Sequence, residues 1–244
     1  MLLLLPPSET KRPGGVGVSI DKLAIIWAAL DPTRDFLYAE LAKLIQDPEE
    51  AARRLKLGRK PEAALAANAS LMSAPTMPAI ERYSGVLFEA LGYGSLSKAA
   101  KERVSQQVFI QSALFGLLPA IEMIPDYKFS ASTSLAGVSL KRLWNTAHDA
   151  VWPRMVGPIL DLRSESYRAL ASIPDREQYF VEVLDAQSGR ALNHFNKKAK
   201  GAFVRQAMEL GISSVKEVPR IAKAAGFQAK IDGQRVLFII PPGF

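Results

Sequence analysis

The sequence predicts a single α+β domain in which a mixed central β-sheet is wrapped by a shell of helices. Short apolar runs typical of buried strands stand near both ends of the 244-residue chain, while residues 21–106 have an almost wholly helical pattern. Strict alternation of strand and helix is missing, which argues against a doubly wound fold. Hydrophobic residues make up 48% of the chain and no linker divides it, so we treat residues 1–244 as one domain.

The first strand is predicted at Leu2–Leu5, where the apolar run ends at Pro6 and is too short for a signal peptide or a membrane span. In the helical layer, Asp47 followed by Pro48 is a helix start, because Asp caps and Pro fits the first turn. Further strands are predicted at about 107–111, 158–162, 179–195 and 227–240, the last as a hairpin around Asp232-Gly233. Later helices are predicted at 140–152, after Ser164, at 198–210 before Gly211, and at 214–225.

The composition excludes several kinds of chemistry. The chain has no cysteine, which rules out a thiol nucleophile, a disulfide scaffold and a Cys-ligated metal. With only two histidines, His148 and His194, we expect no metal site and no cofactor. A net charge of +7 favours anionic partners, and a cysteine-free chain fits the reducing cytoplasm.

Polar and basic side chains follow three predicted strands. Ligands often bind at such exits, where backbone amides and helix N-termini converge, although strand ends are also polar simply because they meet water. The first exit carries Ser8, Glu9 and Lys11, the middle one Asp161, Arg163 and Ser164, and a later one His194, Asn196 and Lys197.

The strongest local signal is the basic stretch 194–206, HFNKKAKGAFVRQ. Residues 190–223 hold eight basic and two acidic side chains, a local charge of +6. On a helix, Lys198, Gly201 and Arg205 share one face, and Lys197 and Lys200 add to the basic cluster. Because glycine weakens a helix, Gly201 indicates close approach by another backbone or by a ligand. The cluster is either an anion-binding face or the solvated side of an amphipathic helix.

Residues 194–196 are interpreted as the end of a strand. Alternation then places His194 and Asn196 on one face and Phe195 in the core. Lys197 and Lys198 would enter the N-terminus of the following helix, where two cations oppose the helix dipole and favour a bound anion.

Two weaker motifs remain. QSALFGLLP, residues 111–119, is a tight hairpin with one glycine, which is either a buried turn or a turn whose amides contact DNA phosphates. Arg82-Tyr83 and Tyr127-Lys128 pair a phenol with a cation, a combination that stacks on bases or binds phosphate, or else leaves a half-buried ring beside a snorkelling cation.

Several blocks of the sequence together resemble the YaaA family of peroxide stress proteins over nearly the whole chain. They are LLLLPPSETK near the start, RYSGVLFEAL at 82–91, QSALFGLLPAIEMIPDYKFSAS at 111–132, GPILDLRSESY at 157–167 and NHFNKKAKGAFVRQ at 193–206. The PPSE and HFNK forms are similar to the branch common in actinobacteria.

The resemblance implies a compact cytosolic α+β protein that protects against hydrogen peroxide by lowering free iron. It also implies DNA binding through a positive cleft and a helix–hairpin–helix element, and it carries over no established enzymatic reaction, so whether the chain is an enzyme stays open. Positions that match the family pattern are Arg82, Tyr83, Gly85, Tyr127, Asp161, Arg163, Ser164, Tyr167, His194, Asn196, Lys197, Lys200, Gly201 and Arg205. Lys128 stands where the family usually has Arg, Glu9 replaces a lysine of the more distant form, and Pro119-Ala120 replaces an Arg-Pro.

The sequence therefore supports two alternative functions. The first is a DNA-binding stress protein whose phosphate contacts are Lys197, Lys198, Lys200, Gly201, Arg205, Lys128 and Arg163. The second is an enzyme or binder of a small anionic, nucleotide-like ligand whose pocket collects Ser8, Glu9, Lys11, Arg82, Tyr83, Tyr127, Asp161, Ser164, His194 and Asn196. Direct iron sequestration is disfavoured, because without cysteine iron would need an oxygen-rich carboxylate site. The sequence makes no prediction of oligomeric state and predicts no membrane association.

Overall fold

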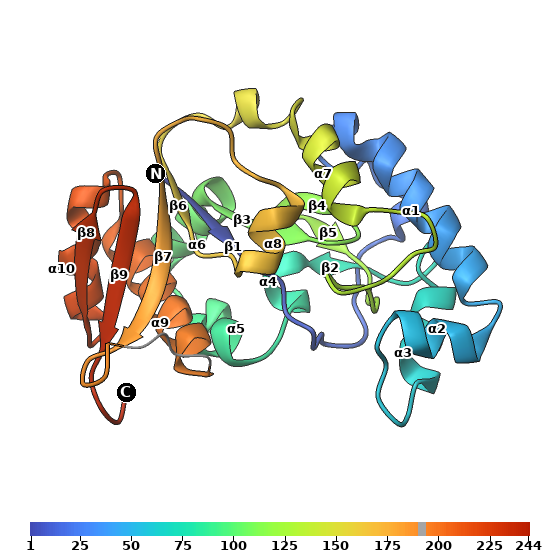
Figure 1. Cartoon of the computed structure of the whole chain (residues 1–244), viewed down its shortest axis with the longest axis horizontal. Coiled ribbons are helices and arrows are strands. Elements are labelled where there is room, and N and C mark those ends of the chain that lie inside the picture. Colours follow the sequence, from blue (N-terminus) through green and yellow to red (C-terminus); the bar gives the residue numbers. More distant parts are fainter. Residues whose placement is uncertain (190–193) are drawn as a thin grey trace.

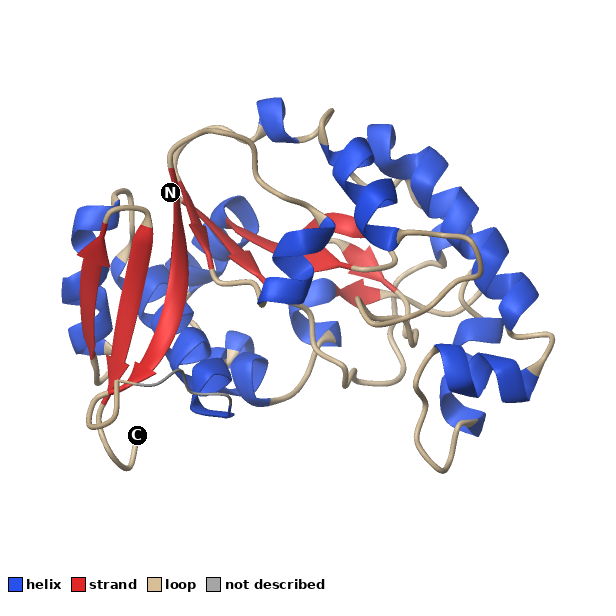
Figure 2. Cartoon of the chain, viewed as in Figure 1, coloured by secondary structure: helices blue, strands red, loops and turns tan. Residues whose placement is uncertain are grey.

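A seven-stranded mixed sheet runs through the molecule in the order β4-β3-β1-β6-β7-β9-β8 (Figures 1 and 2). The computed structural model describes residues 1–189 and 194–244. Strands β3, β1, β6, β7 and β9 are parallel, and β4 and β8 close the two edges in antiparallel fashion. The strands span Leu2–Leu5 (β1), Val108–Ser112 (β3), Gly116–Pro119 (β4), Ile159–Asp161 (β6), Gln178–Asp185 (β7), Gln228–Asp232 (β8) and Arg235–Ile240 (β9).

Helices surround this sheet, and most of the early ones lie between β1 and β3 in the chain, as the sequence predicts. They are α1 (Asp31–Leu44), α2 (Pro48–Arg54), α3 (Glu62–Ala69), α4 (Ala79–Arg82), α5 (Val86–Leu91) and α6 (Lys98–Gln107). Later come α7 (Leu140–His148), α8 (Glu165–Leu170), α9 (His194–Leu210) and α10 (Val218–Ala224). Short 3₁₀ turns occupy Ile20–Lys22, Ala28–Leu30, Tyr93–Ser95, Trp152–Arg154 and Val215–Glu217, and β2 (Met77–Pro78) pairs with β5 (Met123–Ile124).

Local chemistry explains several element ends. The Asp47 carboxylate accepts hydrogen bonds from the amides of Glu49 and Glu50 and so caps α2. Gly211 ends α9 at a φ of 77°, and Gly233 turns the β8–β9 hairpin at a φ of 57°, both in the left-handed region that glycine favours. These predictions are confirmed.

The core lies on both faces of β1 and β3 and on one face of the β7–β9 half. Leu3, Leu4 and Leu5 have no exposed surface, which explains why β1 is apolar throughout rather than alternating. In β9 the buried Phe238 packs against Phe203 of α9 at a ring-centre distance of 4.8 Å. Its neighbours in sequence point to the opposite face, which is more open.

The strand region predicted at 179–195 is confirmed only in its first part, which is β7. From His194 onward the described chain is helical as part of α9, so the strand expected to reach residue 195 is wrong at His194 and Phe195. The apolar residues Ala199 and Phe203 stand four apart and are buried, which favours a helix through this stretch. Residues 190–193, which the predicted strand also covered, lie outside the described residues.

Candidate functional site at the carboxyl edge of the sheet

Strands β1 and β6 lie side by side and parallel, with Leu4 opposite Asp161. From β1 the chain continues to β3 on one side, whereas from β6 it continues to β7 on the other. The loops that leave β1 and β6 therefore diverge from one edge, which is the topological switch point where sheets of this kind bind ligands. The first two polar exits of the sequence, after Leu5 and at Asp161, share this edge.

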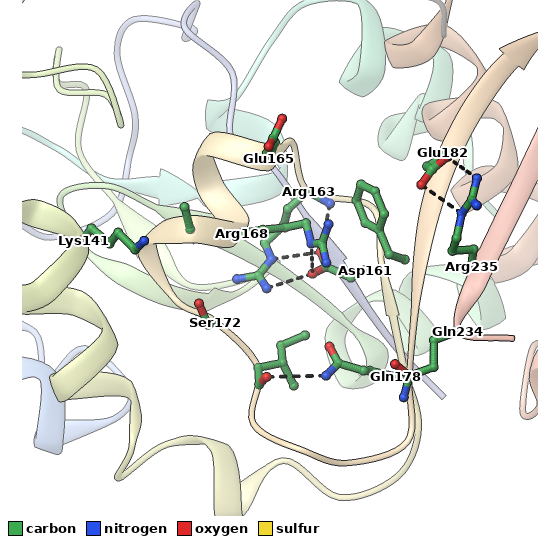
Figure 3. A pocket seen from close by; sticks show the side chains of 13 residues that line it. Lys141, Asp161, Arg163, Glu165, Arg168, Ser172, Gln178, Glu182, Gln234 and Arg235 are labelled. Atoms are coloured by element: carbon green, nitrogen blue, oxygen red, sulfur yellow. Dashed lines mark hydrogen bonds and ion pairs between the residues drawn. The ribbon is translucent and has the colours of Figure 1, made fainter. Parts of the chain in front are cut away.

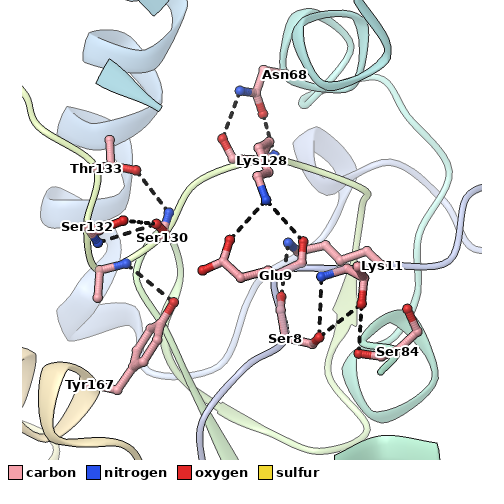
Figure 4. A network of polar contacts seen from close by, with 12 residues as sticks. Ser8, Glu9, Lys11, Asn68, Ser84, Lys128, Ser130, Ser132, Thr133 and Tyr167 are labelled. Atoms are coloured by element: carbon pink, nitrogen blue, oxygen red, sulfur yellow. Dashed lines mark hydrogen bonds and ion pairs between the residues drawn. The ribbon is translucent and has the colours of Figure 1, made fainter. Parts of the chain in front are cut away.

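Six of the predicted residues gather beside the loop after β1, and we call them the Lys11 cluster: Ser8, Glu9, Lys11, Tyr83, Tyr127 and Lys128. Figure 4 shows most of them converging from the β1 loop and from the segment that follows β5. The Lys128 ammonium lies 2.9 Å from the Glu9 carboxylate. The Asn68 side chain donates a hydrogen bond to the Lys128 carbonyl and accepts one from the Lys128 amide. Lys128 thus forms an ion pair with Glu9, whose side chain is exposed, so this cation is already partly neutralised at the surface.

Lys11 occupies the inner part of this cluster. Its ammonium lies 4.2 Å from the ring centre of Tyr127 and 5.6 Å from that of Tyr83. It donates one long hydrogen bond, 3.4 Å, to the Ser8 carbonyl. Burial, reinforced by the charge of Lys128, lowers the pKa of Lys11 to about 8. Its charge is therefore only partly compensated inside the protein.

The two phenols continue into a buried hydrogen-bond chain. The hydroxyls of Tyr83 and Tyr127 are 2.6 Å apart, and the Tyr127 hydroxyl is 2.8 Å from Ser112 Oγ. Ser112 Oγ also accepts hydrogen bonds from the backbone amides of Leu114 and Phe115, each at 3.1 Å. Sequence reasoning missed Ser112, although its place at the end of a predicted strand was a signal.

The turn that these amides belong to is the predicted hairpin. Residues 108–119 form the antiparallel pair β3–β4, and Leu114 and Phe115 at its tip have no exposed surface. Because their amides already bond Ser112 inside the protein, this turn is buried and does not offer its amides to a nucleic acid. The buried-turn interpretation of the sequence is therefore the one the structure supports.

The second group surrounds Asp161 at the end of β6 (Figure 3). The Asp161 carboxylate receives two hydrogen bonds from the Arg163 guanidinium, at 2.8 and 2.9 Å, and lies 3.6 Å from Arg168 Nε. Arg163 is fully buried and also donates to the Ala171 carbonyl at 2.9 Å. Its guanidinium is thus committed to the fold, and it is placed as a positioning residue for Asp161.

Beside this pair lies a pocket of about 570 Å³ on the open face of the β6–β9 half. The Arg168 guanidinium stacks on the Phe180 ring at 3.7 Å, and Glu182 pairs with Arg235 across β7 and β9 at 2.9 Å. Sequence reasoning did not select Arg168 or Phe180, since neither stands in a recognisable motif.

Lys200 is the buried cation of α9. It is 4% exposed and makes no hydrogen bond or ion pair with any residue that the structure describes. Its ammonium lies 5.9 Å from the Phe180 ring centre. Burial lowers the pKa of Lys200 to about 8, while the charge of Asp161 raises it and that of Arg168 lowers it.

The rest of the predicted basic face of α9 does not form one open surface. A Cβ on Gly201 would lie 2.1 Å from the Leu87 carbonyl oxygen, so the close approach expected there is made by the backbone of α5. Arg205 donates to the Leu91 carbonyl at 3.0 Å and to Ser95 Oγ at 2.9 Å, which satisfies the C-terminus of α5. Lys197 and Lys198 are exposed.

The remaining predicted residues are dispersed. Arg82 is fully buried and donates to the carbonyls of Arg12, Pro75 and Ile124, so it is part of the fold rather than of the open site. Ser164 is exposed before α8, and its hydroxyl pairs with Ser166 at 3.1 Å instead of capping the helix. Asn196 is half-buried in α9, and the side chain of His194 lies outside the described residues.

Two features are absent from the part of the chain that the structure describes. No helix there has the length and hydropathy needed to cross a membrane. Nor does any group of three or more His, Cys, Asp and Glu side chains come together as metal ligands would.

The fold and this edge define a single-domain α+β protein with one buried lysine, Lys200, and one half-buried lysine, Lys11, near the switch point of a mixed sheet. The chain belongs to the family described as peroxide stress protein YaaA, whose model matches residues 1–232. It is 37% identical over 243 residues to a UPF0246 protein of Corynebacterium efficiens, covering 96% of this chain and 97% of that protein. It is 36% identical over 219 residues to a UPF0246 protein of Streptomyces coelicolor, covering 86% of this chain and 84% of that protein. The predicted resemblance, including its actinobacterial branch, is confirmed.

Proposed function

We propose that this peroxide stress family member binds a small anionic ligand at the carboxyl edge of the sheet, between the loops that follow β1 and β6. The observation that carries the proposal is Lys200, a buried amine without an ion pair among the described residues. A buried charge is costly unless an opposite charge compensates it. Lys11 is a second, half-buried cation, which lies against two phenol rings and makes one long hydrogen bond to the Ser8 carbonyl.

A compact ligand fits these residues better than a duplex does. Lys11 and Lys200 are enclosed, whereas tracking a nucleic-acid backbone needs cations that reach outward. Of the side chains expected to contact phosphates, Lys128 is ion-paired with the exposed Glu9, and Arg163 and Arg205 donate to acceptors of the fold. Groups whose pKa values are strongly shifted by burial are common at functional sites, and the lowered pKa values of Lys11 and Lys200 therefore support a binding site here.

The test is calorimetric titration of the full chain with inorganic phosphate, pyrophosphate and ATP at pH 7. We expect at least one of them to bind, and Lys11→Met and Lys200→Met to weaken that binding. Lys230→Met, on the exposed edge strand β8, is the matched control and should bind as the unaltered protein does. Affinity should fall as the pH rises through about 8, where both lysines lose their protons. Equal affinity of the Lys11, Lys200 and Lys230 variants would refute the proposal.

DNA binding is the second candidate, and exposed cations on α9 and α10 favour it. In this outer layer only Arg220 is paired among the described residues, with Glu217 at 3.3 Å. The Lys198 ammonium lies 5.0 Å from the Phe244 ring, which packs on Phe227 directly after α10. The exposed cations are Lys197, Lys198, Lys216, Arg220 and Lys223.

A gel-shift titration at several salt concentrations tests this candidate. Each phosphate contact should contribute roughly 0.9 to the slope of log affinity against log salt. The double variant Lys197→Gln/Lys198→Gln should reduce that slope by about 2 and leave thermal stability equal or slightly higher. Binding that is absent at low salt, or a slope that the double variant leaves unchanged, would exclude a DNA-binding face here.

The lowering of free iron that the family resemblance implies is proposed to be indirect. The described residues bring no three metal-ligating side chains together. Metal analysis of the purified chain after dialysis against a chelator should therefore find no stoichiometric iron. About one retained iron per chain would require a direct role.

A further inference from the structure

The pocket beside Asp161 holds an arginine whose hydrogen-bond donors are unused. Arg168, on α8, lines this pocket of about 570 Å³. Its guanidinium makes no hydrogen bond with any residue that the structure describes, and its ionic contact there is the 3.6 Å approach of Nε to Asp161. A guanidinium carries five N–H donors and stays charged in proteins. Arg168 therefore has both its charge and its donors available for a ligand.

The Phe180 ring holds this guanidinium in place. The guanidinium carbon of Arg168 lies 3.7 Å from the ring centre, so the planar group stacks on the ring. Figure 3 shows Arg168 between Asp161 and the side of the pocket where Lys141 lies. A side chain that is already ordered loses less conformational freedom when a ligand binds. The same ring lies 5.9 Å from the Lys200 ammonium, so the pocket adjoins the edge at which anion binding is proposed.

The pocket keeps a surplus of positive charge. Its lining has four basic and three acidic side chains, a net charge of +1 (four minus three). Arg163 compensates Asp161 through two hydrogen bonds of 2.8 and 2.9 Å. Arg235 compensates Glu182 in the same way, at 2.9 and 3.1 Å. The charged side chains of the pocket outside these two pairs are Lys141, Arg168 and the exposed Glu165. An oxyanion between Lys141 and Arg168 therefore meets two cations.

A different kind of contact is available at Gln178, which lines the same pocket. Its side-chain amide nitrogen donates to the carbonyl oxygens of Pro174 at 3.2 Å and Ile173 at 3.4 Å. These two acceptors determine which way the amide is turned, so Oε1 is directed away from them. Among the described residues no donor binds Oε1. The pocket thus offers one neutral acceptor in addition to its two cations.

We propose that this pocket binds a small hydroxy acid or polyol phosphate, whose oxyanion is held by Arg168 and Lys141 and whose hydroxyl donates to Gln178 Oε1. Carboxylate and phosphate oxygens both match the paired N–H groups of a guanidinium, and such charge-assisted hydrogen bonds are strong. The volume of about 570 Å³ is within the range of small-molecule sites. This inference rests on the proposed anion-binding function and names the class of ligand and the groups that recognise it.

Four small probes test the ligand class by calorimetric titration of the full chain at pH 7. Glycerol 3-phosphate and glycerate carry both an oxyanion and hydroxyls, whereas methyl phosphate lacks the hydroxyls and glycerol lacks the oxyanion. We expect glycerol 3-phosphate or glycerate to bind, and the tighter of the two shows whether the site prefers phosphate or carboxylate. Methyl phosphate should bind more weakly than glycerol 3-phosphate, and glycerol should not bind. Equal binding of methyl phosphate and glycerol 3-phosphate would contradict the hydroxyl contact at Gln178, and equal binding of glycerol would contradict the anion contact.

Variants of Arg168 test the recognition group with the tighter probe. Arg168→Met should weaken its binding by about 10-fold or more, because it removes the charge and all the donors. Arg168→Lys keeps the charge but loses the planar pair of N–H groups, so it should still bind about 3-fold or more weakly than the unaltered protein. Arg59→Met is the matched control, since Arg59 is exposed between α2 and α3 and outside the pocket. Thermal melting of each variant checks that it is folded.

The same titrations separate this inference from the proposed function when Lys200→Met is included. If Arg168→Met binds as tightly as Arg59→Met while Lys200→Met binds weakly, the anion is held at Lys200 alone and this inference is wrong. If none of the four probes binds but phosphate, pyrophosphate or ATP does, the ligand class assigned here is wrong and the proposed function stands. If no anion of either set binds, both fail.

Discussion

Replacing Gly201 by alanine tests whether this glycine serves helix packing or ligand binding. The added Cβ would lie 2.1 Å from the Leu87 carbonyl oxygen and 2.9 Å from Ala90 Cβ, so α9 must move away from α5 by about 1 Å or more. Overpacking of this kind costs about 1–3 kcal/mol, and contact with backbone rather than a flexible side chain favours the upper end. Alanine recovers about 1 kcal/mol of helix propensity. The net expectation is a loss of about 2 kcal/mol in the free energy of unfolding.

Urea denaturation followed by circular dichroism measures this loss directly. A change of about 2 kcal/mol corresponds to a fall in Tm of roughly 4–8 °C for a chain of this size. Gly94→Ala is the matched control, because a Cβ at Gly94 meets nothing within 4 Å and its φ is not in the left-handed region. Gly94→Ala should be neutral or slightly stabilising. If Gly201→Ala is as stable as Gly94→Ala, the packing argument is refuted and a ligand role for Gly201 returns.

Three further substitutions probe buried polar groups. Lys200→Met should have a higher free energy of unfolding than the unaltered protein at pH 7, because it removes a buried charge. Between about pH 8 and 10.5 the unfolded form of the unaltered protein binds more protons than its folded form, so the unaltered protein gains stability with pH and the difference between the two proteins should shrink. Urea titrations across that pH range measure the difference. Asp161→Asn should lower the free energy of unfolding by about 3–5 kcal/mol, because it leaves the fully buried Arg163 without its carboxylate, and a loss below 1 kcal/mol would contradict that assignment. Tyr38→Phe removes a buried hydroxyl that has no partner among the described residues, so thermal melting should show equal or higher stability, and a clear loss would reveal a partner.

Local signals predicted most of the fold. The apolar run Leu2–Leu5 is β1, Asp47 caps α2, and Asp232-Gly233 turns the final hairpin. Each of these depends on residues within a few positions of one another. The strand predicted up to residue 195 failed because a short polar and apolar alternation is compatible with both periods, and the longer helical pattern of α9 decides between them.

The site was harder to predict because tertiary contacts decide which cations are available. The i, i+3, i+7 spacing selected Lys198, Gly201 and Arg205 as a basic face, but α5, more than a hundred residues earlier in the chain, docks against Gly201 and receives Arg205. Lys200, on another side of the helix, is the buried cation instead. Ser112 was missed because its role depends on the tight turn of β3–β4, which brings two amides to one oxygen.

The central place of β1 in the sheet has a consequence for how the chain folds. Leu2–Leu5 are made first, but their partners on the two sides are Val108–Ile110 and Ile159–Asp161. At a synthesis rate of about 5–20 residues per second, the second partner strand follows roughly 8–30 s later. Until then four consecutive leucines lack their sheet, and pairing over such sequence separations is slow. The centre of the sheet can therefore form only after about two thirds of the 244 residues have been made.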